Sequence, residues 1–89
     1  MNHLQLLNEL EELTQHLGVQ LRYEKGDFEG GYCILKDQKI LLINKRFHDA
    51  KKASTLAQAL NDFGIDNIYI KPILRQFIED EVAKASKVK

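Results

Sequence analysis

Residues 29–62 read EGGYCILKDQKILLINKRFHDAKKASTLAQALND, and three structural patterns follow one another within them. Two apolar runs on either side of Asp37-Gln38 predict an antiparallel hairpin, with a tight turn or a slightly longer loop. The second run is apolar at every position from 40 to 43, which is typical of a central strand covered on both faces. Apolar residues at three- and four-residue spacing then predict a helix that packs on the sheet. These residues are Ala53, Leu56, Ala57, Leu60 and Phe63.

The residues before this segment predict a helix and a first strand. Leucines recur at four- and three-residue steps over residues 3–17, with Asn2 as a candidate N-cap and Gly18 placed to end the helix. Residues 19–24 alternate apolar and polar side chains, as a half-buried strand does. Three glycines and an aspartate make residues 25–31 a loop.

The residues after residue 48 predict two helices with an ambiguous segment between them. Asp49 is a candidate N-cap of the helix introduced above, and Gly64 is placed to end it. Residues 67–71 alternate, so they fit a short fourth strand, parallel to the third, as well as a loop. Pro72 suits the first position of a last helix, and residues 83–89 are expected to fray.

These elements make one domain of the α+β class over residues 1–89. The predicted order is an N-terminal helix, a three-stranded and largely antiparallel sheet, a core helix, the short fourth strand where it forms, and a C-terminal helix. A chain of 89 residues buries a small core, so stabilisation by a homodimer is a reasonable expectation.

Charge and composition restrict the partners that this chain is expected to have. Thirteen basic residues balance thirteen acidic ones, which argues against a dedicated nucleic-acid binder. No apolar run approaches the ~20 residues that a membrane-spanning helix needs. The single cysteine fits a reducing environment, so a cytoplasmic location is expected.

The sequence contains no complete catalytic or metal-binding constellation. Zinc sites draw their ligands in close pairs, whereas the histidines and the cysteine are scattered at His3, His16, Cys33 and His48. Gly30-Gly31 enters a strand, so a bulge, a tight bend or a close backbone approach explains it better than a phosphate loop. We therefore expect no metal, no cofactor and no enzyme activity.

Two features remain as candidate sites. Lys45, Arg46, Lys51 and Lys52 surround the start of the second helix, where cations oppose the helix dipole and can mark an anion or nucleic-acid site. Solvated surface charge is the plainer reading of these four residues. Cys33 lies in an apolar run, where a small buried side chain is expected and thiol chemistry is the alternative. The favoured hypothesis is a non-catalytic protein-interaction module that forms a homodimer or binds another protein.

Part of the chain resembles a family of zinc peptidases. Ile43-Asn44 followed by Thr55-Leu56-Ala57-x-x-Leu60 is similar to the core of the HExxH peptidases of the phage-immunity type. On this resemblance Gln58 and Asp62 take the two ligand positions, and Ala59 takes the position of the general base. Since these residues supply neither the two imidazoles nor the glutamate, the resemblance implies a non-catalytic relative. An ordinary amphipathic helix produces the same apolar pattern.

The chain also resembles small bacterial proteins of unknown function. Their shared Gly-Gly-x-Cys-x-Leu strand corresponds here to Gly30, Gly31, Cys33 and Leu35. Their C-terminal Pro-x-x-x-Arg helix corresponds here to Pro72 and Leu74-Arg75, with the arginine at the third step after the proline instead of the fourth. This resemblance implies no particular activity.

Overall fold

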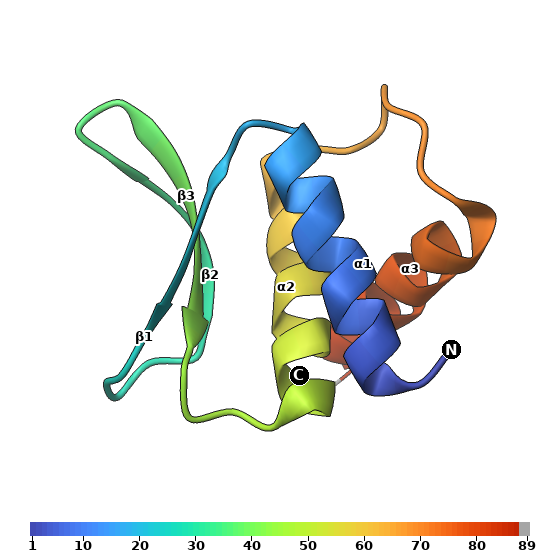
Figure 1. Ribbon diagram of the computed structural model, residues 1–89, viewed down its shortest axis with the longest axis horizontal. Helices are drawn as coiled ribbons and strands as arrows, with labels where there is room; N and C mark the ends of the chain where they lie inside the picture. The colour runs from blue at the N-terminus through green and yellow to red at the C-terminus, as the bar shows by residue number, and fades with distance from the viewer. Residues whose placement is uncertain (88–89) are drawn as a thin grey trace.

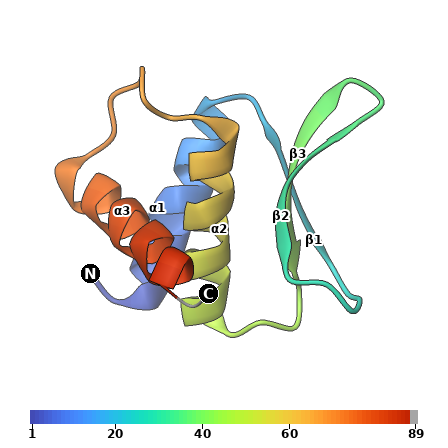
Figure 2. The ribbon, with the colours of Figure 1, turned by 180° about the vertical axis from the view of Figure 1, so that it is seen from behind.

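A computed structural model describes residues 1–87, which form three helices and one sheet (Figure 1). The elements are α1 (His3–His16), β1 (Gln20–Glu24), β2 (Gly30–Leu35), β3 (Gln38–Asn44), α2 (Asp49–Phe63) and α3 (Pro72–Lys87). Helix α2 packs on β2 and β3, α1 packs on α2 and also meets β1, and α3 packs on α2, so all three helices stand on the same side of the sheet (Figure 2). The predicted α+β class is confirmed.

The sheet is mixed, whereas the sequence analysis predicted a largely antiparallel one. Strand β3 lies in the centre, with β2 antiparallel on one side and β1 parallel on the other. The β2–β3 hairpin and the central place of β3 are confirmed. The parallel pairing was not foreseen because it joins residues about 20 positions apart, and local periodicity does not report such pairing.

The turn between β2 and β3 is a two-residue loop, Lys36-Asp37, one residue earlier than predicted. Both residues have positive φ, 50° for Lys36 and 69° for Asp37. Two positive φ values are characteristic of a type I′ turn, whose twist matches that of the two strands. Lysine is a poor residue for this conformation, so the turn stores backbone strain.

We expect the double substitution Lys36→Asn and Asp37→Gly to stabilise the protein by about 1 kcal/mol, because asparagine and glycine adopt positive φ more readily. Urea denaturation of the variant and the parent protein measures the difference. Asp27→Gly is a matched control, since Asp27 is not among the residues with positive φ. It should destabilise the protein through the entropy of the unfolded chain. An unchanged or lower urea midpoint for the double variant would contradict the expectation.

The helix ends follow the predicted signals, with one correction. The Asn2 side chain caps α1 in a capping box, and Gly18 follows the helix with a φ of 72°. Gly64 ends α2 with a φ of 104°. The N-cap of α2 is His48 instead of Asp49, because His48 has the extended backbone of a cap and its Nδ1 accepts a hydrogen bond from the Lys51 amide at 3.3 Å.

Residues 67–71 form no strand, so the option of a fourth strand is not realised. The connection from α2 to α3 is held by Arg75, whose Nη2 donates to the carbonyl oxygens of Ile65 at 3.1 Å and Ile68 at 2.9 Å. Arginine one turn after Pro72 therefore has a structural role. Helix α3 continues to Lys87, so residues 83–87 are helical where fraying was expected. Residues 88 and 89 of the predicted tail lie outside the described part of the chain.

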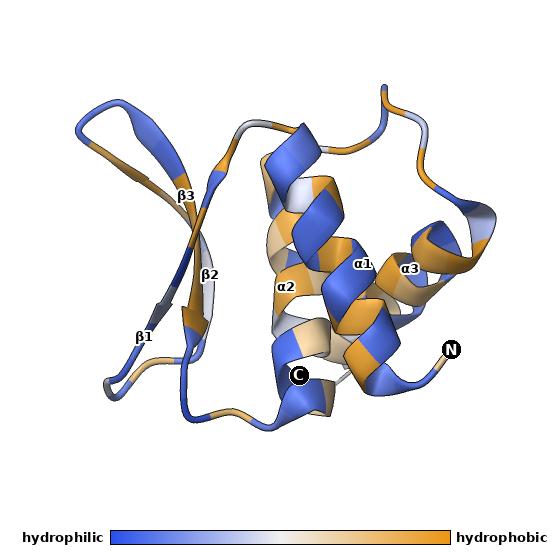
Figure 3. Ribbon diagram, viewed as in Figure 1, coloured by the Kyte–Doolittle hydropathy of each residue, from blue (hydrophilic) through white to orange (hydrophobic). Residues whose placement is uncertain are grey.

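The core is centred on α2. Leu56 and Leu60 of this helix are fully buried against Leu10 of α1, Leu41 of β3 and Ile78 of α3. Figure 3 shows the alternation of hydrophobic and hydrophilic residues that gives each helix one apolar side. No helix within residues 1–87 is both long and apolar enough to cross a lipid bilayer.

The two faces of β3 meet different surroundings, although both were expected to be covered. Leu41 and Ile43 join the core cluster beneath the helices. The alternate residues, Ile40 and Leu42, point to the other face of the sheet, which we call the outer face. No helix of the described residues packs there (Figures 1 and 2). Ile40 is nevertheless buried between its neighbours, and Leu42 is half-buried.

Candidate functional site

The free edge of β2 is the first candidate surface. Within residues 1–87 this strand pairs with β3 alone. Its sequence, GGYCIL, has no charged residue and no proline, the two devices that usually protect a strand edge from pairing with another chain. An edge without these devices is suited to protein–protein contact.

The turn geometry identifies the backbone groups that this edge presents. In a hairpin with a two-residue loop, the flanking pair is hydrogen-bonded, so Leu35 bonds to Gln38. Because the pattern alternates, Gly31, Cys33 and Leu35 bond to β3. The N–H and C=O groups of Gly30, Tyr32 and Ile34 therefore face away from the sheet.

The side chains of β2 add an apolar surface to this edge. Ile34 is 62% exposed and Leu35 is 54% exposed. Cys33 is also exposed, and the prediction that it is buried is wrong. Its apolar neighbours in sequence suggested a core position, but it lies on the outer face of an edge strand, beside Ile40 of β3.

The free edge of β1 has a different character, because charged and polar groups surround it. Arg22 and Glu24 form an ion pair on the strand. The Tyr23 side chain points the other way, toward α1, and its hydroxyl donates to the carboxylate of Glu11. Burial of the Tyr23 ring and this hydrogen bond together raise the pKa of the hydroxyl.

The four basic residues singled out from the sequence do not converge on one point. Lys45 and Arg46 are exposed in the turn before α2. Lys51 Nζ lies 3.5 Å from the Glu29 carboxylate and 5.4 Å from the centre of the Phe47 ring. Lys52 Nζ lies 5.3 Å from the centre of the Tyr23 ring. Since Glu29 precedes β2 and Tyr23 belongs to β1, the two lysines point toward opposite edges of the sheet.

The positions that correspond to peptidase ligands lie away from the sheet. Ala59 is 1% exposed, within the core. Gln58 Nε2 donates to Ser54 Oγ at 3.1 Å. Gln58 and Asp62 line a hollow of about 220 Å³ that is closed on its other side by Val82 and neighbouring residues of α3. Gln58 also lines a hollow of about 380 Å³, together with Glu29 before β2 and Glu81 of α3.

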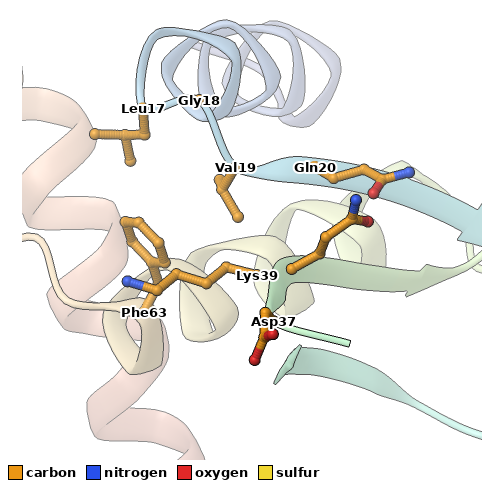
Figure 4. A pocket seen from close by; sticks show the side chains of 8 residues that line it. Leu17, Gly18, Val19, Gln20, Asp37, Lys39 and Phe63 are labelled. Carbon is orange, nitrogen blue, oxygen red and sulfur yellow. The ribbon is translucent and has the colours of Figure 1, made fainter. Parts of the chain in front are cut away.

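A further hollow, of about 470 Å³, lies at the end of the sheet that carries the hairpin turn (Figure 4). Val19 and Phe63 point into it. Its charged side chains are Asp37 and Lys39, which have opposite signs. Lys39 Nζ already lies 5.6 Å from the centre of the Phe63 ring, so this lysine occupies the aromatic face that a cationic ligand would use.

Neither a search for metal-binding side chains nor comparison with known proteins assigns an activity to these surfaces. Within residues 1–87, no group of three or more His, Cys, Asp or Glu side chains is placed to hold a metal ion. Comparison of the chain with models of protein families, with curated proteins and with solved structures gave no match.

The two free edges were not foreseen from the sequence. The uncharged run GGYCIL is the available signal for the β2 edge, but it predicted only a strand of the hairpin with Cys33 buried. The surroundings of the β1 edge depend on α1, which meets β1 through the Tyr23–Glu11 hydrogen bond. No periodicity connects these two residues, so only the folded chain brings them together.

Proposed function

We propose that this chain is a small, non-catalytic protein-interaction module of the cytoplasm, which forms a homodimer through the free edge of β2. The observation that carries the proposal is the six-residue edge strand without charge or proline, on which the side chain of Ile34 is exposed. Pairing with a second copy would satisfy its unpaired backbone groups.

Antiparallel pairing of two β2 strands is self-complementary. With Tyr32 on the two-fold axis, Gly30 lies opposite Ile34 of the second copy, and Gly31 lies opposite Cys33 of the second copy. Three outward-facing pairs each exchange two hydrogen bonds. The glycines leave space for the larger side chains opposite them, and the two uncharged strands do not repel each other.

The outer face supports the same arrangement. Cys33 and Leu35 are exposed there; Cys33 lies opposite Ile40 of β3, and Leu42 of β3 lies opposite Gly31. Joining two copies edge to edge makes these apolar residues into one continuous surface across the dimer. The buried Ala59 and the absence of the two imidazoles support a role without peptidase chemistry.

Ile34→Lys is expected to weaken the homodimer by about a hundredfold in Kd, because the two-fold axis applies each substitution twice. It removes two apolar contacts and places an ammonium group at each strand edge. Sedimentation equilibrium over a range of concentrations measures the change. The parent protein should approach twice the chain mass of 10.3 kDa, and the variant should remain near that mass.

Ile73→Lys is the matched control. Ile73 is 50% exposed on α3, far from β2 in the chain, so the same change of charge there should leave the dimer intact. Hydrogen exchange adds a local measurement: amides of Gly30, Tyr32 and Ile34 should become protected as concentration rises. A strict monomer at ~1 mM, or a dimer equally tight with Lys at position 34, would refute the proposal.

A further inference from the structure

A groove runs between α1 and the free edge of β1, which is the edge of the sheet opposite to β2. It has a volume of about 690 Å³. Val19 and Leu21 form its apolar base, and the wall belongs to α1. The wall residues are Asn8, Glu11, Glu12, Gln15 and His16.

The edge of β1 presents unpaired backbone groups to this groove. The Lys45 amide donates to the Glu24 carbonyl oxygen at 2.8 Å, so the backbone groups of Glu24 point toward β3. By alternation, the N–H and C=O groups of Leu21 and Tyr23 point away from the sheet. The side chain of Leu21 enters the groove, so an added strand would meet both the backbone and an apolar base.

Charge determines which occupant suits the groove. Its carboxylates are Glu12 and Glu11, of which Glu11 also accepts a hydrogen bond from the Tyr23 hydroxyl, and none of the described residues that line it is a lysine or an arginine. Glu9, the neighbouring acid of α1, is already paired with Lys71 Nζ at 2.8 Å, which raises the pKa of that lysine. The carbonyl end of α1 adds partial negative charge at the same place, so Glu12 near this end favours a nearby cation.

We propose that this groove binds an extended basic segment of another protein, which adds to the sheet as an antiparallel strand beside β1. Strand addition uses the free backbone groups of Leu21 and Tyr23 for affinity, and alternate side chains of the added segment for selectivity. In an antiparallel pair, residues that exchange hydrogen bonds with Leu21 and Tyr23 have their side chains on the same face as these two. Lysines at those positions reach Glu11 and Glu12, while the residues between them point to the outer face.

This binding mode goes beyond the homodimer and is compatible with it. Pairing through β2 leaves both β1 edges at the ends of the joined sheet. The dimer would thus offer two equivalent grooves, and failure of either proposal leaves the other unaffected.

The test uses a fluorescein-labelled peptide, Lys-Val-Lys-Val-Lys-Val, titrated with the full chain while fluorescence anisotropy is recorded. We expect saturable binding that weakens as salt is added. The peptide Glu-Val-Glu-Val-Glu-Val should bind at least about tenfold more weakly, since its carboxylates face those of Glu11 and Glu12. Equal binding of the two peptides would overturn the charge argument and with it the proposal.

Two methylated peptides test the strand register. Methyl groups on the lysine nitrogens of the peptide backbone remove the donors that face β1, so affinity should fall at least about tenfold. Methyl groups on the valine nitrogens point away from β1 and should leave binding within about twofold. If both methylated peptides bind as well as the parent peptide, no strand is added and the proposal fails.

Protein variants locate the peptide. Glu12→Lys should weaken binding about fivefold, whereas Glu79→Lys, an equal change of charge on an exposed residue of α3, should not.

Hydrogen exchange gives an independent measurement of where the peptide binds. Amides of Leu21 and Tyr23 should gain protection from hydrogen exchange when the peptide is bound. Protection of Tyr32 and Ile34 instead would place the peptide on β2 and overturn the assignment. Absence of binding at ~1 mM peptide would also overturn the proposal. If the chain then assembles beyond the dimer, the β1 edge pairs with another copy of this chain instead.

Discussion

Asn44→Asp is expected to destabilise the protein by about 3 kcal/mol, a large part of the stability of a domain of this size. Asn44 is 5% exposed at the end of β3. Its Nδ2 donates to the carbonyl oxygens of Gly26 at 2.9 Å and Phe28 at 2.7 Å, and its Oδ1 accepts from the Arg46 amide at 3.0 Å. A carboxylate would lose both donors and face two carbonyl oxygens in a buried place.

The position of Asn44 explains why this effect should be large. Strands β1 and β2 lie on opposite sides of β3, so residues 25–29 must cross the end of β3 to connect them. The crossing residues have no strand partners, and the Asn44 amide satisfies two of their carbonyl groups. We infer that this side chain supports the mixed topology of the sheet.

Urea denaturation measures the loss, and Asn67→Asp is the matched control. Asn67 is exposed in the connection between α2 and α3, so the same chemical change there should alter the free energy of unfolding by less than about 0.5 kcal/mol. Similar losses in both variants would mean that charge alone, and not the hydrogen bonds of Asn44, is responsible.

Gly30→Ala is expected to cost about 4 kcal/mol or to prevent folding, because a Cβ atom at residue 30 has no space. It would overlap the carbonyl oxygen of Leu42 and would lie 3.2 Å from the Cα atom of Ile43. Residue 30 also has a φ of 118°, which side chains rarely allow. The backbone of β3 supplies the clashing atoms, so the strand itself must move to relieve the overlap.

Gly31→Ala separates the clash from the backbone strain. Gly31 has a φ of 141°, yet within residues 1–87 no heavy atom apart from those of its two chain neighbours lies within 4 Å of a Cβ built there. It should therefore lose only about 1–2 kcal/mol from strain. Thermal or urea unfolding of both variants makes the comparison, with circular dichroism to detect a variant that does not fold. If Gly31→Ala is the more harmful change, close packing of residue 30 on β3 is not the reason for glycine at that position.

At the Gly30-Gly31 pair, the sequence predicted the type of backbone feature but not the residue that causes it. Two glycines entering a strand predicted a bulge, a bend or a close backbone approach, and the structure has the close approach at Gly30. The residue that makes it necessary, Leu42, is known only once the strand register is known. For the same reason Cys33 was predicted to be buried, since an apolar run does not reveal whether its strand lies at an edge.

Short-range patterns were sufficient for the helices, the hairpin and the α+β class. Capping by Asn2, the end of α2 at Gly64 and the 3.6-residue spacing of apolar side chains all involve neighbours within a few positions of the chain. Local chemistry expresses such preferences directly. The 25–31 loop, by contrast, was recognised without any indication of the strand that it crosses.

Long-range packing settled which strands are edges and what surrounds them. The parallel contact of β1 with β3, the three helices on a single face and the groove beside α1 all join distant residues. Their free energy comes from shared burial and backbone pairing, which exist only when the whole chain has closed. Both surfaces proposed here for binding arise in this way, because a free edge is defined by the strands that do not pair with it.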